Sequence, residues 1–265
     1  LYSNEGGIGI AGTFNISNTR LLVGATMPIE LSNGQKIGSI KNLVSSLEYG
    51  NPQSQSVTLM TGLSQENDSL LGSIGSNAFS LDGARSITTF TALKAQKHLF
   101  DNLSLTGIAT HANTNMTSPS NILVDSARDI KSSSIALVAD MRNISNDDHL
   151  SIFVNQPNRV DSGSIAIKTA SLADSNRNIN QTIKNIDLDS SSRQLNYGLS
   201  YRKDLNESLA FSVKHTITNN LNHSDNSNRL HSSYIGMDYK DLKLGFASNP
   251  NDSSIETELS YAIAL

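Results

Sequence analysis

The chain contains no cysteine and no tryptophan, and only five of its 265 residues are proline. The absence of cysteine excludes disulfides, thiolate metal sites and a cysteine nucleophile. No apolar run reaches the roughly 18 residues that a transmembrane helix needs. Transmembrane β-strands remain possible, because such a strand shows lipid only every second side chain.

Charge and aromatic content are also low. The net charge is −4, with acidic and basic residues interspersed, so no basic stripe is available for nucleic acid. Aromatic residues make up only 5% of the chain, whereas membrane barrels usually carry aromatic girdles at both interfaces. The sequence starts at Leu1 without an initiator Met or a signal peptide, so we expect it to be part of a longer precursor.

Apolar and polar side chains alternate most clearly in the C-terminal third, which predicts antiparallel strands with one apolar and one polar face. Three of the apolar rows are Leu195, Tyr197, Leu199 and Tyr201; Leu209, Phe211, Val213 and Ile217; and Ile255, Leu259, Tyr261, Ile263 and Leu265. The alternation is weaker in the middle of the chain. A strand is also predicted from Leu21 to Ile29, and Asn33-Gly34 after it is a strong hairpin signal. No convincing long helix is found.

The connections between these strands alternate in length from about residue 85 onward. Short turns are expected near Asp101 and at 143–148, 204–206 and 240–241, and long polar loops at 112–131, 174–192 and 219–228. Short turns on one side and long loops on the other are typical of outer-membrane barrels. The N-terminal part departs from this rule, with two short turns in a row near Ser17 and Asn33. Residues 51–265 are therefore expected to form the barrel, and residues 1–50 either further hairpins of it or a preceding segment.

Two short motifs match catalytic or cofactor-binding patterns in spelling only. Gly7-Ile8-Gly9-Ile10-Ala11-Gly12 resembles a dinucleotide fingerprint, but the residues after it continue as a strand instead of opening a helix. Asp161-Ser162-Gly163-Ser164 resembles an aspartic-protease loop, whose chemistry needs a second carboxylate that no repeat supplies. We interpret this tetrapeptide as a turn that enters a strand at Ile165.

The six histidines show no metal-ligand spacing. We therefore expect no catalytic residue, no cofactor and no metal.

Residues 150–163 read Leu-Ser-Ile-Phe-Val-Asn-Gln-Pro-Asn-Arg-Val-Asp-Ser-Gly. This segment resembles the "S-Q-P-x-R-V-E-S-G" pattern in the C-terminal region of autotransporter-type subtilisin-like serine peptidases of Gram-negative, chiefly alphaproteobacterial, bacteria. The residues that carry the resemblance, and to which it gives a structural role, are Gln156, Pro157, Arg159, Val160, Ser162 and Gly163. It implies a translocator-like barrel that follows a protease passenger.

These observations predict an all-β fold, an antiparallel up-and-down barrel of roughly 12 to 14 strands in a bacterial outer membrane. The rows led by Leu195, Leu209 and Ile255 would face lipid. The side chains expected to line a polar lumen are Arg202, Lys214, Glu256 and Glu258. The expected partners are outer-membrane lipid, the barrel-assembly machinery and a passenger domain in the same chain, with the barrel itself a monomer.

Two alternatives stay open. In a soluble β-sandwich or barrel, secreted for adhesion or stabilisation, the same apolar rows would form an interior core. The two folds differ in where the apolar rows point and not in which residues they contain. An aspartic-type hydrolase that uses Asp161 is a third hypothesis, which predicts proteolysis by the purified chain.

Overall fold

A computed structural model describes residues 8–27, 29–30, 36–37, 40–71, 81–117, 123–173, 179–225, 229–240, 242–248 and 255–261. Within these residues the chain is all-β, as predicted. The strands are β1 (Ile8–Ile16), β2 (Thr19–Met27), β3 (Ile29–Glu30), β4 (Lys36–Ile37), β5 (Ile40–Asn51), β6 (Gln55–Asn67), β7 (Arg85–Phe100), β8 (Leu103–Thr117), β9 (Val124–Arg142), β10 (Asp148–Ala173), β11 (Ile179–Asp187), β12 (Leu195–Asn206), β13 (Leu209–Asn219), β14 (Leu230–Tyr239), β15 (Leu242–Ser248) and β16 (Ile255–Tyr261).

Thirteen of the described strands follow one another in a single antiparallel sheet. Their order is β1-β2-β5-β6-β7-β8-β9-β10-β12-β13-β14-β15-β16, and β11 pairs only with β10. This is the up-and-down order that the sequence predicts. Across the described residues no hydrogen-bonded pairing joins β1 to β16, so the sheet is not closed by hydrogen bonds.

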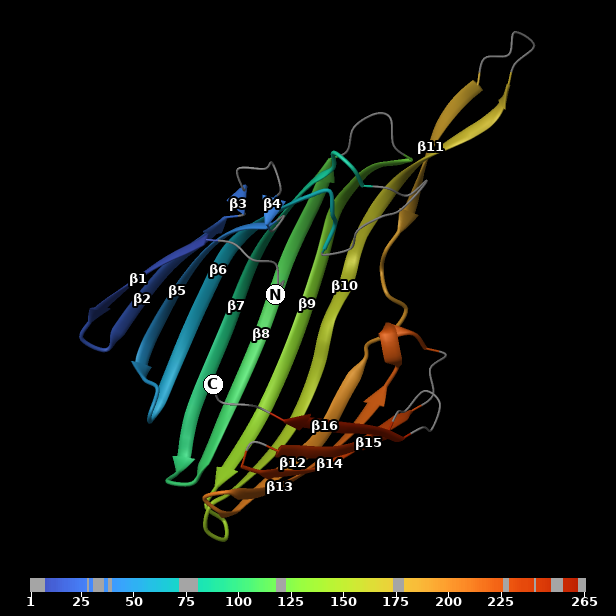
Figure 1. The fold of residues 1–265 in the computed structure, drawn as a ribbon. Helices are drawn as coiled ribbons and strands as arrows, with labels where there is room; N and C mark the ends of the chain where they lie inside the picture. Colours follow the sequence, from blue (N-terminus) through green and yellow to red (C-terminus); the bar gives the residue numbers. More distant parts are fainter. Residues whose placement is uncertain are drawn as a thin grey trace.

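The sheet bends along its length (Figure 1). Strands β1, β2 and β5 to β10 lie side by side as one broad sheet, and β12 to β16 turn across its lower end. The upper part of β10 forms a hairpin with β11 that projects beyond the rest of the sheet. The described part also holds one short 3-10 turn, η2 (Leu221–His223), but no helix that is long and apolar enough to cross a bilayer.

Shorter and longer connections between neighbouring strands alternate along the whole sheet. The strands of β1-β2, β5-β6, β7-β8, β9-β10, β12-β13 and β14-β15 are joined by short turns. Longer connections join β2 to β5, β6 to β7, β8 to β9, β10 to β12, β13 to β14 and β15 to β16. We call the side of the sheet that carries the short turns the turn end, and the side that carries the longer connections the loop end.

The N-terminal part follows the same alternation, contrary to the prediction of two successive short turns. The predicted turn at 32–35 lies outside the described residues, but β3 and β4 flank it and pair only with each other. This small hairpin is therefore part of a longer connection between β2 and β5. Because β1, β2 and β5 pair in the main sheet, the residues from Ile8 to Asn51 continue it.

Two predicted loop or turn segments are strands. Residues 112–131 were expected to form a long polar loop, yet β8 runs to Thr117 and β9 begins at Val124. Asp161 to Ser164 were expected to form a turn, yet they lie inside the 26-residue β10. Both segments belong to the loop-end parts of long strands, where register shifts interrupt the ladder and the period-2 alternation is lost.

Candidate membrane-facing surface and polar inner face

One face of the sheet carries exposed apolar side chains, and the other carries buried polar side chains. Leu59 and Leu93 pair across β6 and β7, and each is 48% exposed. On the other face Thr88 and Thr114 are buried, and their hydroxyl oxygens lie 2.8 Å apart. We call the face with Leu59 the outer face and the face with Thr88 the inner face.

The same inverted arrangement, with apolar side chains exposed and polar side chains buried, extends over most of the sheet. The exposed large apolar residues of the outer face include Leu43, Leu47, Val57, Leu59, Leu63, Leu93, Ile135, Leu137, Ile152, Leu199, Ile235 and Met237. The buried polar residues of the inner face include Ser56, Ser64, Glu66, Ser86, Thr88, Thr114 and Ser132. Met60 and Ile108 are exceptions, being apolar and partly exposed on the inner face. Soluble proteins rarely leave a contiguous apolar patch of this extent exposed, so the outer face is a candidate surface for contact with a membrane or another protein.

The apolar band on the outer face runs at an angle to the strands. One register row begins at apolar Val23 in β2 and becomes polar as it passes through Ser45, Thr61, Thr91 and His111. A row nearer the turn end begins at Lys97 in β7 and becomes apolar through Leu105, Ala139, Ile152 and Leu199. The band thus shifts toward the turn end from β2 to β12, so the strands are tilted relative to it. Such a tilt is what strands need in order to wrap around a barrel.

Exposed aromatic residues collect at the turn end of the outer face. Phe14, Tyr49, Phe100 and Tyr239 are exposed, and each lies within three residues of a short turn. Membrane barrels place aromatic side chains at the boundary between hydrocarbon and water. These four aromatic residues therefore lie where such a boundary is expected on one side of the sheet.

Arg202 and Lys214 lie on the inner face, and their role as lumen-lining residues stays a prediction. Arg202 donates to Asp204 at 3.1 Å and to Asp238 at 2.8 Å, and the Lys214 ammonium lies 6.0 Å from the centre of the Phe153 ring. The side chains of Glu256 and Glu258 lie outside the described set. Their backbone positions in β16 belong to the same register rows as Lys214 and Arg202, respectively. The register thus assigns all four positions to one face.

An apolar cluster covers the inner face near the loop end, where only a polar lumen was expected. It consists of the buried Leu81, Ala84, Met116, Val124, Ala127 and Ile130, with Leu70, Leu71, Val160, Ile165 and Leu188 packed against them. Asp68 holds the two described ends of the β6-β7 connection together, because its backbone N–H donates to the Ala84 carbonyl and its carboxylate accepts from the Gly83 N–H. The described ends of this connection, at Leu70 and Leu71 and at Leu81 and Ala84, therefore pack inward against the sheet.

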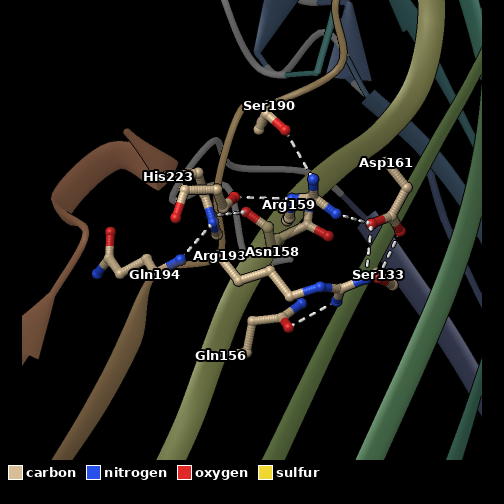
Figure 2. A network of polar contacts seen from close by, with 10 residues as sticks. Ser133, Gln156, Asn158, Arg159, Asp161, Ser190, Arg193, Gln194 and His223 are labelled. Carbon is tan, nitrogen blue, oxygen red and sulfur yellow. Dashed lines mark hydrogen bonds and ion pairs between the residues drawn. The ribbon is translucent and has the colours of Figure 1, made fainter. Parts of the chain in front are cut away.

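The segment that carries the family resemblance lies in β10 next to the β11-β12 connection, and a polar network joins the two (Figure 2). The guanidinium of Arg159 donates to the Ser192 carbonyl at 2.9 Å, the Ser190 carbonyl at 2.7 Å and Asp161 at 2.8 Å. Ser133 of β9 donates to the second oxygen of Asp161 at 2.5 Å. Arg159 thus fastens the connecting segment to the sheet.

A second arginine extends this network toward the β13-β14 connection. Arg193 donates to the Gln156 side-chain oxygen at 2.8 Å and lies 3.8 Å from Asp161. His223 of η2 accepts from the Gln194 backbone N–H at 2.9 Å, and its other ring nitrogen lies 3.1 Å from the Asn158 carbonyl. The motif in β10 therefore contacts two connections that are distant in sequence.

The remaining motif residues have local roles. Pro157 lies at a β-bulge between Gln156 and Arg159, where a residue without a backbone N–H is tolerated. Gly163 has a φ of +139°, and a Cβ there would lie 2.7 Å from the Ile130 Cα, so a larger residue would not fit. Val160 packs on the inner apolar cluster, and Ser162 pairs with Lys131.

Two polar clusters could be taken for a hydrolase active site: the network around Asp161 and a group formed by Asp140, His149 and Ser151. Neither has the required geometry. Both oxygens of Asp161 have hydrogen-bond partners, Arg159 and Ser133, and among the described residues no hydrogen bond joins Asp161 to a second carboxylate. On the inner face, Asp140 and Ser151 both approach the same nitrogen of His149, Nε2, at 3.1 and 3.3 Å. A serine triad needs the carboxylate on the opposite ring nitrogen, so this group cannot relay a proton in that way.

Sequence reasoning did not find Ser133, Arg193 or His223 as members of this network. They come from separate strands and connections, and no local pattern links them to Arg159.

No family model and no curated protein sequence matches this chain. Among solved structures, it is similar to the crystal structure of the toluene transporter TodX of Pseudomonas putida. The TM-score is 0.45 with 11% sequence identity, and the alignment covers 91% of this chain and 76% of that one. No residue role is transferred from this likeness.

Proposed function

We propose that the chain is a non-catalytic membrane-spanning β-barrel domain of a bacterial outer membrane. The observation that carries the proposal is the inverted polarity of the sheet, with Leu59, Leu93 and Ile152 exposed on one face and Ser86, Thr88 and Thr114 buried on the other. In lipid, burial of the outer face in hydrocarbon replaces the core that a soluble sheet would need. The inner face then encloses a polar interior.

Three further features support this proposal. The connections alternate between short turns and longer loops along the whole sheet, which gives the two ends the asymmetry of outer-membrane barrels. The apolar band is tilted against the strands. Aromatic side chains lie near the turn end. On this account the turn end faces the periplasm and the loop end faces the outside.

We also propose that the domain anchors or exports a passenger in the same polypeptide, as its resemblance to autotransporter-type peptidases implies. The support is the segment from Gln156 to Gly163, which carries the resemblance and whose side chains hold loop-end connections on β10. A subtilisin-like protease passenger is the finer form of this proposal. Surface exposure of an epitope fused before Leu1, measured on intact cells, tests it. An epitope that is accessible only after lysis would contradict it.

Electrophoresis of heated and unheated samples tests the membrane-barrel proposal. Membrane barrels resist unfolding in detergent, so we expect the unheated sample to migrate differently from the boiled one. Recovery of folded chain from the soluble fraction without detergent would instead support the soluble β module, and would overturn the proposal.

A further inference from the structure

Basic side chains lie on the outer face directly beyond the apolar rows, on the side of the loop end. In β9 the exposed Leu137 and Ile135 are followed, toward the loop end, by Ser133 and Lys131. In the neighbouring β10 the exposed Ile152 is followed by Gln156 and Arg159. The change from apolar to basic residues therefore occurs at similar positions in two adjacent strands.

In the ion pairs of the described residues, the basic side chains at this place outnumber the carboxylates. Arg159 and Arg193 share one carboxylate, that of Asp161, whose Oδ1 atom lies 2.8 Å from one and 3.8 Å from the other. One carboxylate balances only one of the two guanidinium groups. Lys131 is exposed, pairs with the residue after Asp161, and forms no ion pair within the described part of the chain. The nearby carboxylates of Asp129, Asp187 and Asp189 form no ion pair with Lys131, Arg159 or Arg193 among the described residues.

The two arginines differ in how free they are to bind a ligand. Arg159 is 14% exposed, and all three of its guanidinium nitrogens donate to protein oxygens. Arg193 is 60% exposed and uses one nitrogen for Gln156, so donors of its guanidinium remain available. Gln156 and Asp161 orient Arg193 without covering it. The arrangement presents one oriented guanidinium and one unpaired ammonium on the same face.

We propose that Lys131 and Arg193 bind a phosphate group of an outer-leaflet lipid headgroup, of the lipopolysaccharide class. This inference rests on the proposed function, because it requires the outer face to lie in lipid. Guanidinium and ammonium groups are the usual partners of phosphate in proteins. A phosphorylated lipid fits better than a free anion, since its acyl chains would cover the exposed Ile135 and Leu137 next to the basic pair while its phosphate meets the charges.

The test uses the folded full chain in detergent micelles, with lipopolysaccharide binding measured by native mass spectrometry. The test variant is Lys131→Gln combined with Arg193→Gln. The matched control is Lys94→Gln combined with Lys97→Gln. It removes the same charge from exposed positions, Lys94 on the inner face and Lys97 toward the turn end of the outer face. Dephosphorylated lipopolysaccharide and inorganic phosphate are the further probes.

We expect the affinity for lipopolysaccharide to fall about tenfold or more in the test variant, because two charge-assisted contacts are lost, and to stay unchanged in the control. Dephosphorylated lipopolysaccharide should bind the unmodified chain as weakly as intact lipopolysaccharide binds the test variant. Equal affinities for the two double variants would overturn the inference. Inorganic phosphate that competes as well as the lipid would also overturn it, by assigning a free-anion site. If the unheated chain shows no mobility shift on electrophoresis, the proposed function fails; if the shift is intact and lipopolysaccharide binding does not depend on these residues, only this inference fails.

Discussion

The hydroxyl groups of Thr88 and Thr114 lie 2.8 Å apart on neighbouring strands, and both side chains are buried although they belong to the polar face of the sheet. Leu93, on the opposite face of the same strand as Thr88, is 48% exposed. A soluble sheet would bury Leu93 and expose the threonines. The pair therefore marks the side of the sheet that is protected from solvent.

Replacement of Leu93 by arginine tests the outer face. A charged side chain on the lipid face of a barrel costs about 2–4 kcal/mol near the bilayer centre, so we expect Leu93→Arg to lower the free energy of unfolding from vesicles by that amount. Leu93→Met is the control, since it keeps an apolar side chain. Urea titration of the two variants in vesicles measures the difference. Equal stabilities would show that Leu93 does not contact lipid.

A double-mutant cycle on Thr88 and Thr114 tests the inner face. Thr114→Val leaves the buried Thr88 hydroxyl without its partner and should cost about 1–3 kcal/mol. The double variant Thr88→Val with Thr114→Val removes both groups and should cost less than the sum of the single variants. Additive effects in the same urea titration would mean that the two hydroxyls do not depend on each other.

The alternation of apolar and polar residues was sufficient to predict the antiparallel strands and their division into two faces. Period 2 is a local property, so the rows led by Leu195 and Leu209 could be assigned before any pairing was known. The same pattern fits a soluble and a membrane sheet equally well. The direction in which the apolar rows point depends on the closure and curvature of the whole sheet, which no local pattern encodes.

Long strands were harder to predict at their loop ends. Asn113, Thr114 and Asn115 of β8 are polar on both faces, so the alternation disappears although the strand continues. The network of Arg159 could not be predicted either, because Ser133 and Arg193 lie 26 and 34 residues away from it in sequence. Only the folded sheet brings them together. The inner apolar cluster was missed for the same reason.

Arg159→Lys tests whether the motif in β10 fastens the β11-β12 connection. Lysine keeps the charge but cannot donate to Asp161 and to two carbonyl groups in the same fixed geometry. Since hydrogen bonds to a charged group contribute about 1.5–3 kcal/mol each, we expect faster proteolytic cleavage within residues 188–194. Cleavage at the unmodified rate would show that the segment is held by other contacts. Arg128→Lys, at an exposed arginine in β9, is the control.

Asp161→Asn separates this structural role from the hydrolase hypothesis. The substitution removes the charge that Arg159 and Arg193 share, so we expect the same increase in cleavage at 188–194 by an added protease. We expect the purified chain to cleave no peptide substrate, with or without the substitution. Proteolysis by the unmodified chain that Asp161→Asn abolishes would contradict this account.

The two edge strands of the sheet, β1 and β16, give a further prediction. β1 and β16 run in the same direction, because an even number of reversals separates them. Unpaired backbone groups cannot remain in hydrocarbon. In a bilayer we therefore expect the backbone amides of β1 and β16 that point away from their one neighbouring strand to be hydrogen-bonded as well. Hydrogen exchange of residues 8–16 and 255–261 in vesicles should be as slow as in β7. Fast exchange there would mean that the edges stay open, and would exclude their position within the membrane.

The most direct test of the inverted sheet uses the absence of cysteine, which lets a single cysteine be introduced and spin-labelled at any position. The labelled variants are Leu59→Cys, Leu93→Cys and Ile152→Cys on the outer face, with Ser64→Cys and Thr88→Cys on the inner face. In vesicles, the outer labels are expected to collide frequently with oxygen and rarely with a water-soluble nickel reagent, and the inner labels to lack this oxygen preference. Outer labels that the nickel reagent reaches freely would contradict the account.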